Sequence, residues 1–201
     1  MKLKIVIGST RQGRSTDKVA NWATKQIGDQ ADTEVLDLKD YVLPFFEEAV
    51  SPQFNPDRKP EGAVKAWLDK LSEADALIIV TPEYNRSIPG VLKNALDHVG
   101  FELKGKVIGL VSHGSTGGAQ AIAHLRGIVP GLLAYTAPTA VMMPGMAGMI
   151  FDEDGNLTAD NASHQDRLHG ALMSQLQELK ATCTCNKVCK CDDCTCKNCK
   201  C

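Results

Sequence analysis

Residues 76–97 read ALIIVTPEYNRSIPGVLKNALD, and this stretch indicates the fold. Its first six residues are a short apolar run, rich in β-branched side chains, of the kind that forms a buried strand. Apolar residues at helical spacing follow a proline-containing loop, so a strand leads directly into a helix. The same alternation recurs along the chain, which is the pattern of a parallel sheet covered by helices on both faces.

Five strand-like segments are recognisable. They cover residues 4–8, 33–38, 76–81, 107–112 and, less clearly, 139–143. Helical patterns lie around residues 19–27, 64–71, 92–99 and 168–179, and the proline-rich segment 41–60 is expected to be a long irregular connection. Five strands in such a chain favour a doubly wound α/β sheet in the order 2-1-3-4-5, which binds ligands at the carboxyl ends of its strands.

The bulk composition is that of an ordinary globular protein. The 201 residues are 43% hydrophobic and carry a formal net charge of −2, which gives no support to a nucleic-acid or membrane-surface role. No apolar run approaches the roughly 20 residues that a membrane-spanning helix needs, and the first strand is too short for the apolar core of a signal peptide. We therefore expect a cytoplasmic protein with neither a nucleic-acid nor a membrane partner.

The loop after the first strand has the composition of a phosphate site. Residues 8–16 read GSTRQGRST and lead into a helix. Backbone N–H groups and the dipole at a helix N-terminus favour an anion, and two arginines and four hydroxyl side chains add further donors. The loop is neither a GxGxxG fingerprint nor a Walker loop, and the alternative is an ordinary serine-capped turn.

Two further loops extend this pattern. Residues 82–97 read PEYNRSIPGVLKNALD, residues 112–118 read SHGSTGG, and HLR follows at 124–126. With the first loop, these motifs closely resemble the NAD(P)H-dependent FMN reductases, a flavodoxin-like group that includes quinone, azo-dye and chromate reductases. The resemblance covers roughly residues 1–180. It implies a flavodoxin-like fold with helices on both faces of the sheet, FMN as cofactor and NAD(P)H as co-substrate.

The resemblance also implies which residues hold the cofactor. The FMN phosphate would be bound by Ser9, Arg11, Arg14, Ser15 and Thr16. The isoalloxazine ring would lie against Pro82, Glu83, Tyr84 and Asn85 on one side and Ser112, Gly114 and Ser115 on the other. Tyr84 and Asn85 are the nearest candidates for a catalytic contact, although hydride transfer through a flavin requires no protein proton donor. We expect His113 in the flavin loop or at the surface, and His98 and His124 at an interface or in the core.

The activity implied by the resemblance is a reductase with two half-reactions. NAD(P)H reduces FMN and leaves, and a small-molecule acceptor (a quinone, azo compound, flavin or oxidised metal such as chromate) then takes the electrons. A flavodoxin-type electron carrier is an alternative, but the arginines of the first loop argue against it. The family works as dimers or tetramers, so we expect a homodimer or homotetramer that uses residues 91–99 and the helix beginning near Gly117.

All eight cysteines lie in the last part of the chain. They form four Cys-x-Cys pairs: Cys183, Cys185, Cys189, Cys191, Cys194, Cys196, Cys199 and Cys201. This segment has one aliphatic residue and cannot fold on a hydrophobic core, while its thiolates suit Zn(II), Cu(I) or Cd(II). It resembles a metallothionein segment; a disordered redox-sensitive tail or an artificial fusion is the alternative. We divide the chain into a flavodoxin-like FMN-binding domain, 1–180, and an irregular metal-binding tail, 183–201. A metal-sequestering protein with the body as carrier is therefore a further possibility.

Overall fold

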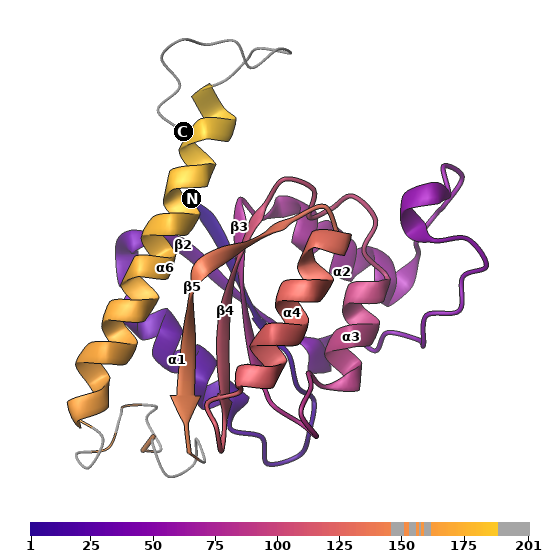
Figure 1. Cartoon of the computed structure of the whole chain (residues 1–201). Helices are drawn as coiled ribbons and strands as arrows, with labels where there is room; N and C mark the ends of the chain where they lie inside the picture. Colours follow the sequence, from indigo (N-terminus) through magenta and orange to yellow (C-terminus); the bar gives the residue numbers. More distant parts are fainter. Residues whose placement is uncertain (146–150, 153–155, 157, 159–161, 189–201) are drawn as a thin grey trace.

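The computed structural model describes residues 1–145, 151, 152, 156, 158 and 162–188, with side chains of the last helix described for 164–181. Its centre is one parallel sheet in the order β2-β1-β3-β4-β5. The strands are β1 (Lys2–Ile7), β2 (Asp32–Asp37), β3 (Ala76–Pro82), β4 (Val107–Gly114) and β5 (Tyr135–Pro144). The doubly wound order expected from the sequence is confirmed, and Figure 1 shows the strands between helices on the left (α1 and α6) and on the right (α2, α3 and α4).

Helices cover both faces of the sheet. One face packs against α1 (Thr16–Ile27) and α6 (Ala162–Val188), and the other against α2 (Gly62–Glu73), α3 (Gly90–Asp97) and α4 (Ala119–Gly131). Every residue of the central strand β3 is buried, whereas the edge strands β2 and β5 mix buried and exposed positions. This is why the β3 segment is a continuous apolar run. Short 3₁₀ turns follow at Gly28–Gln30, Leu38–Asp40 and Pro52–Phe54.

The fifth strand is longer than the predicted 139–143, and its pairing with β4 is interrupted by a bulge. The register shifts between Ile108 and Leu110 of β4, where β5 advances by more residues than its partner. Gln175 of α6 fills this place, its side-chain amide donating to the carbonyls of Leu110 and Thr139 at 3.0 and 2.9 Å. A Cβ on Gly109 would lie 2.6 Å from the Gln175 side-chain oxygen, so only glycine fits beneath it.

The last helix also extends beyond its predicted end at residue 179. Helix α6 continues to Val188, so the backbone at positions 183 and 185 is helical, where an irregular tail was expected. The chain has no glycine or proline between residues 171 and 188 to stop the helix. The other six cysteines lie outside the described residues. Helix α6 runs from the carboxyl end of the sheet to its amino end (Figure 1).

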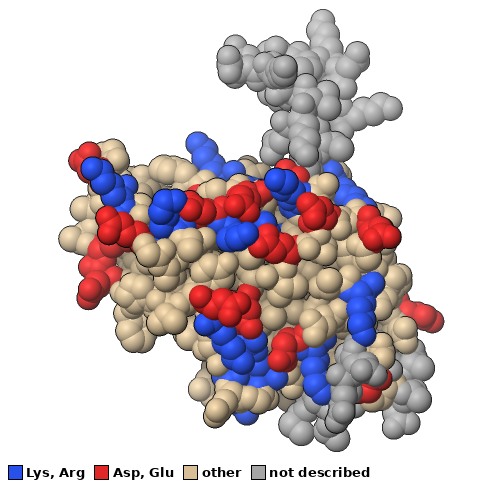
Figure 2. Space-filling view, turned by 180° about the vertical axis from the view of Figure 1, so that it is seen from behind, with Lys and Arg blue, Asp and Glu red and all other residues tan. Residues whose placement is uncertain are grey.

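Charged side chains are mixed over the surface. On the face shown in Figure 2, lysines and arginines lie among aspartates and glutamates rather than in a patch of one sign. Lys4 and Lys70 both pair with Glu34, which links β1, β2 and α2. Within the described part of the chain, no helix combines the length and the apolar character that a membrane span requires.

Candidate functional site

Three loops meet at the carboxyl end of the sheet. Strands β1, β3 and β4 are neighbours, so the loops that follow them, residues 8–15, 83–89 and 115–118, emerge side by side at the lower edge of the sheet in Figure 1. Parallel strands place all their carboxyl ends at one edge, which is where doubly wound folds bind ligands. The structure thus brings together the segments in which the sequence analysis placed the cofactor site.

The first loop turns tightly into α1. A Cβ on Gly8 would lie 2.8 Å from the Leu92 side chain and 3.0 Å from the Val80 carbonyl, so glycine lets the loop pass close to β3 and α3. Ser15 occupies the N-cap position, but its side chain makes no capping hydrogen bond. The alternative of a serine-capped turn is therefore wrong, because the serine cap is missing. The Ser15 hydroxyl lies at the positive end of the α1 dipole and makes no hydrogen bond to the first turn of the helix.

Ser9 and Arg11 join the first loop to the second. The buried Ser9 hydroxyl lies 2.9 Å from the Tyr84 hydroxyl and accepts a hydrogen bond from the Arg11 N–H at 3.3 Å. The Arg11 guanidinium lies 5.9 Å from the centre of the Tyr84 ring, within cation–π range. Arg11 is otherwise exposed, so its charge is available to a ligand in the loop.

Arg14 differs from Arg11 because its guanidinium is buried and already paired. It donates to both carboxylate oxygens of Asp37, at the end of β2, and to the Ser9 carbonyl. The hydrogen bonds to Asp37 raise the Arg14 pKa above its ordinary value. Burial raises the Asp37 pKa, but the hydrogen bonds from Arg14 and from the Lys39 N–H outweigh burial and hold that pKa below its usual range. In this geometry Arg14 fixes the loop backbone, and its contact with phosphate stays a prediction.

Thr16 and His113 connect the first loop to the third. Thr16, the first residue of α1, is buried, and its hydroxyl lies 3.0 Å from His113 Nε2. Burial lowers the His113 pKa to about 4, so the imidazole is neutral at physiological pH. The structure thus rules out the surface position considered for His113. Because Nε2 is engaged by Thr16, this nitrogen is not directed at a substrate.

The second loop contains a tight two-residue turn. Tyr84 and Ser87 exchange two backbone hydrogen bonds of 2.9 and 3.0 Å, and the residues between them, Asn85 and Arg86, have φ values of +50° and +67°. Positive φ at both central positions defines a type I′ turn, which asparagine tolerates better than arginine. The Ser87 hydroxyl lies 2.8 Å from Nδ1 of His124 on α4. His124 is exposed rather than part of the core, whereas His98 is buried.

The third loop is packed against the second. Glu83 donates its N–H to the His113 carbonyl at 3.0 Å, and its carboxylate accepts the Gln120 N–H in the first turn of α4 at 2.9 Å. The buried Ser112 hydroxyl donates to the Gly117 carbonyl at 2.6 Å, so it shapes the loop from inside. A Cβ on Gly118, whose φ is +77°, would lie 2.6 Å from the Ser112 Cβ.

The remaining expected residues lie at the carboxyl ends of β3 and β4 or directly after them. Pro82 is buried at the end of β3, Gly114 is half-buried at the end of β4, and Ser115 is exposed. Asp37, which pairs with Arg14, was missed. It could have been suspected because the carboxyl ends of β1 and β2 are adjacent and the first loop contains two arginines.

Metal ligands do not gather in the described residues. Within residues 1–145 and the described positions beyond them, no cluster of three or more His, Cys, Asp or Glu side chains could hold a metal ion. The cysteines expected to bind metal are not included in this statement, because the described side chains end at residue 181.

Comparison with known proteins agrees with the geometry of the three loops. A family model described as NADPH-dependent FMN reductase matches residues 1–148, which contain all three loops. The chain belongs to this family. This FMN reductase is therefore an NAD(P)H-dependent oxidoreductase with FMN as cofactor, and residues 183–201 lie outside the matched region.

Individual relatives show the same kinship. An NAD(P)H-dependent FMN reductase of Schizosaccharomyces pombe is 34% identical over 140 residues, covering 69% of this chain and 70% of the relative. An FMN-dependent NADPH-azoreductase of Staphylococcus haemolyticus is 31% identical over 172 residues, or 83% and 89% of the two chains. A 2-hydroxy-1,4-benzoquinone reductase of a Burkholderia species is 35% identical over 136 residues, or 64% and 69%.

A solved structure supports the fold. The flavoenzyme NAD(P)H:acceptor oxidoreductase of Paracoccus denitrificans superimposes with a TM-score of 0.71 and covers 89% of this chain and 97% of its own. At 22% sequence identity this likeness speaks for the flavodoxin-like architecture alone.

The residues of the three loops fit a phosphorylated, planar cofactor. The first loop contains the exposed Arg11 charge, the N-terminus of α1 and the Ser15 hydroxyl, which makes no capping hydrogen bond. Together these groups suit a phosphate. In the third loop, Gly114, Gly117 and Gly118 have positive φ values and no side chains. The backbone of such a loop can therefore approach a flat ring closely, with its amides in contact with the ring.

Proposed function

We propose that this FMN reductase transfers electrons from NAD(P)H to quinones or azo compounds, with free flavins and oxidised metals such as chromate as further acceptors. The observation that supports it best is the joining of the three loops at one edge of the sheet, through Ser9–Tyr84 and Thr16–His113. The azoreductase and benzoquinone reductase among the relatives favour these acceptor classes.

Each loop has its own part in this proposal. Arg11, Ser15 and the N-terminus of α1 bind the phosphate, Ser9 and Thr16 order that loop from within, and Arg14 holds its backbone against Asp37. Residues 82–85 lie along one side of the ring, and Gly114 and Ser115 close the other side. FMN, when bound, supplies the two-electron chemistry that links hydride donor and acceptor.

The order of events follows if the hydride donor and the acceptor use the same face of the flavin. In this proposal Tyr84 and Asn85, in the second loop, orient first the nicotinamide and then the acceptor on that face. We therefore propose a ping-pong order, in which the oxidised nucleotide leaves before the acceptor enters. Because His113 Nε2 is engaged by Thr16, acceptor protonation does not depend on this histidine.

The phosphate assignment can be tested with the variant Arg11→Ala/Ser15→Ala. It removes a charge-assisted and a neutral hydrogen bond, together about 2–4 kcal/mol. The FMN dissociation constant should therefore rise by about 30- to 700-fold at 1.4 kcal/mol per decade. Lys65→Ala, an exposed position on α2, is the matched control and should leave the constant unchanged. An unchanged constant in the double variant contradicts the phosphate assignment.

A flavodoxin-type electron carrier, the alternative, should differ from a reductase in how fast it oxidises NADPH without a partner protein. A reductase oxidises NADPH rapidly in the presence of a quinone alone, whereas a flavodoxin-type carrier needs a partner reductase. Stopped-flow measurement of flavin bleaching by NADPH, without any other protein, separates the two. Slow bleaching together with rapid reduction by an added reductase would favour the carrier.

We propose that the enzyme is a homodimer or homotetramer that uses α3 and α4. Phe101, shortly after α3, is 54% exposed, and Leu133, directly after α4, is 42% exposed. The Gly105 N–H donates to the Leu133 carbonyl at 2.8 Å, so these two segments are neighbours. Exposed apolar side chains gathered near two adjacent helices are typical of an interface. A monomer with full activity in sedimentation at micromolar concentration would contradict this proposal.

The cysteine-rich segment is proposed to bind Zn(II), Cu(I) or Cd(II) independently of the flavin. Helix α6 ends at Val188, at the amino end of the sheet, whereas the three loops lie at its carboxyl end (Figure 1). Thiolates in this number also suit a reducing compartment, the cytoplasm. Cd(II) titration should give thiolate charge-transfer absorption, at about two to three metals per chain, that is lost when the chain ends at residue 182. Equal Cd(II) uptake by the shortened chain would contradict the metal-binding assignment. Loss of flavin on shortening would contradict the independence of metal binding and flavin binding.

A further inference from the structure

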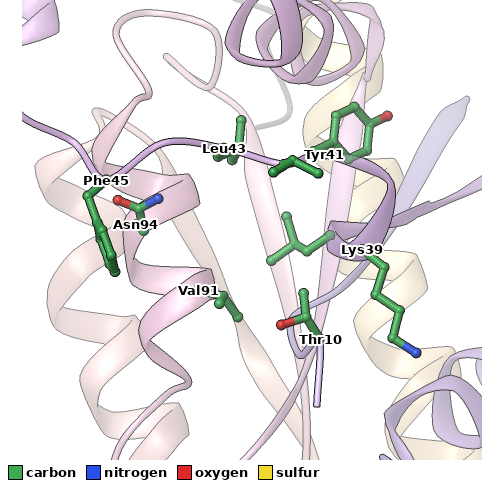
Figure 3. A pocket seen from close by; sticks show the side chains of 9 residues that line it. Thr10, Lys39, Tyr41, Leu43, Phe45, Val91 and Asn94 are labelled. Atoms are coloured by element: carbon green, nitrogen blue, oxygen red, sulfur yellow. The ribbon is translucent and has the colours of Figure 1, made fainter. Parts of the chain in front are cut away.

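A pocket lies beside the first loop, among residues that the flavin assignment does not use. It has a volume of about 330 Å³, and Figure 3 shows the side chains that line it. Its walls are mainly apolar and come from the turn after β2 and the following segment, Leu38, Tyr41, Leu43 and Phe45, together with Val91 at the start of α3. The volume falls within the range of small-molecule sites.

The pocket is preformed, although most of its wall has no regular secondary structure. Asn94 of α3 accepts the Phe46 N–H at 2.9 Å and donates to the Pro44 carbonyl at 2.8 Å. His98 Nε2 lies 3.0 Å from the same carbonyl. Tyr41 packs edge-on against the buried Trp67, with ring centres 5.4 Å apart. These contacts fix residues 41–46 against α2 and α3, so a ligand would not have to order them.

One end of the pocket is polar. Thr10 and Lys39 lie at this end, and Phe45 lies at the other (Figure 3). The Lys39 N–H donates to Asp37 Oδ1 at 2.9 Å, so the carboxylate that pairs with Arg14 also anchors the backbone of Lys39. Among the described residues, no carboxylate lies within ion-pair distance of the Lys39 ammonium, and Asp37 and Asp40 are its acidic neighbours in sequence. An aromatic group with an anionic end fits such a lining.

We infer that this pocket takes the 2′-phosphorylated adenosine of NADPH, with Lys39 pairing with the 2′-phosphate. The inference rests on the proposed function, because the nicotinamide must reach the flavin loops while the rest of the nucleotide needs a site next to them. Thr10 belongs to both the first loop and the pocket. The adenine lies between the apolar walls of Leu43 and Val91, and the ammonium meets a charge that NADH lacks.

The direct test measures binding of two nucleotide fragments to the flavin-loaded, full-length protein. Isothermal titration uses adenosine 2′,5′-bisphosphate and adenosine 5′-monophosphate, with wild type and Lys39→Gln. We expect Lys39→Gln to weaken the bisphosphate about tenfold, as for one charge-assisted hydrogen bond, and the monophosphate by less than about twofold. Lys104→Gln is the matched control, since Lys104 is an exposed lysine just before β4, at the opposite end of the sheet.

A second variant tests the adenosine pocket apart from the phosphate. Val91 is 41% exposed, so Val91→Trp narrows the pocket without overfilling the core. We expect it to weaken both fragments by a similar factor. In steady-state assays, Lys39→Gln should lower the ratio of kcat/KM for NADPH to that for NADH about tenfold.

Several results would overturn the inference. They are equal weakening of both fragments by Lys39→Gln, an effect of Lys104→Gln as large as that of Lys39→Gln, and unchanged fragment binding in Val91→Trp. A fall in kcat/KM for the acceptor with no change for NADPH would assign the pocket to the acceptor instead. Failure of the proposed function is recognised separately, because flavin binding and reduction by NADH are measured on the wild type without reference to Lys39.

Discussion

The ion pair between Arg14 and Asp37 should decide how firmly the first loop is held. The Arg14 side chain is 4% exposed, and its guanidinium donates to both oxygens of Asp37 and to the Ser9 carbonyl. Its Nε has no hydrogen-bond partner among the described residues. We predict that Asp37→Ala destabilises the protein and weakens FMN binding, because it leaves a buried guanidinium with the Ser9 carbonyl as its remaining acceptor.

The size of the effect follows from burial. Removing one partner of a buried ion pair costs about 3–5 kcal/mol. The Asp37 side chain is 22% exposed. Water therefore screens part of the interaction, and we expect a loss of about 2–4 kcal/mol in the free energy of unfolding. Asp37→Asn retains the shape and one acceptor oxygen and should cost about 1–2 kcal/mol.

The assay is urea unfolding of the flavin-free protein at pH 7, since bound flavin would add its own stabilisation. Asp69→Ala is the control, because Lys65 and Asp69 form a pair whose side chains are 60% and 56% exposed. Such a surface pair should contribute less than about 0.5 kcal/mol. A loss for Asp37→Ala no larger than that of the control would refute the reasoning.

The same ion pair predicts a pH dependence. The hydrogen bonds from Arg14 and Lys39 outweigh burial and lower the Asp37 pKa in the folded state. A lowered carboxyl pKa stabilises the fold above its unfolded-state value, about 4, and the stabilisation is lost as the pH falls through the folded-state pKa. The difference in unfolding free energy between wild type and Asp37→Asn should therefore shrink below pH 4. A difference that stays constant to pH 3 would contradict this.

Three further predictions concern residues around the loops and the core. Gly118→Ala places a Cβ 2.6 Å from the Ser112 Cβ at a φ of +77°, and should lower stability by about 1–3 kcal/mol and weaken FMN binding, as measured by thermal unfolding and flavin fluorescence. Trp67→Phe removes the 2.9 Å hydrogen bond from the indole N–H to the Ala95 carbonyl, and should cost about 1–2 kcal/mol in urea unfolding. Because the His113 pKa of about 4 lies below its unfolded value of 6.5, the unfolded chain binds more protons between these values. Stability should therefore fall, on the order of 3 kcal/mol, as the pH drops from 6.5 to 4, and this fall should be absent in His113→Gln.

The sequence alone determined the sheet and the place of the site. Buried runs such as ALIIVT, alternating with helical spacing, are local patterns, so they could be interpreted without knowing which segments pair. Parallel strands align their carboxyl ends, which put the loops after β1, β3 and β4 at one edge. The motifs in those loops were sufficient to indicate the FMN reductase family that the comparisons show.

The tertiary structure decided what depends on contacts between distant residues. The pairing of Arg14 with Asp37, the Thr16–His113 hydrogen bond and the Gln175 side chain at the β5 bulge join positions between 23 and 97 residues apart. No local periodicity contains such a contact, because it depends on how helices and strands pack after they form. The pocket beside the first loop has the same origin. Its wall is an irregular segment, which is held in place by hydrogen bonds with Asn94 and His98 and by the packing of Tyr41 on Trp67.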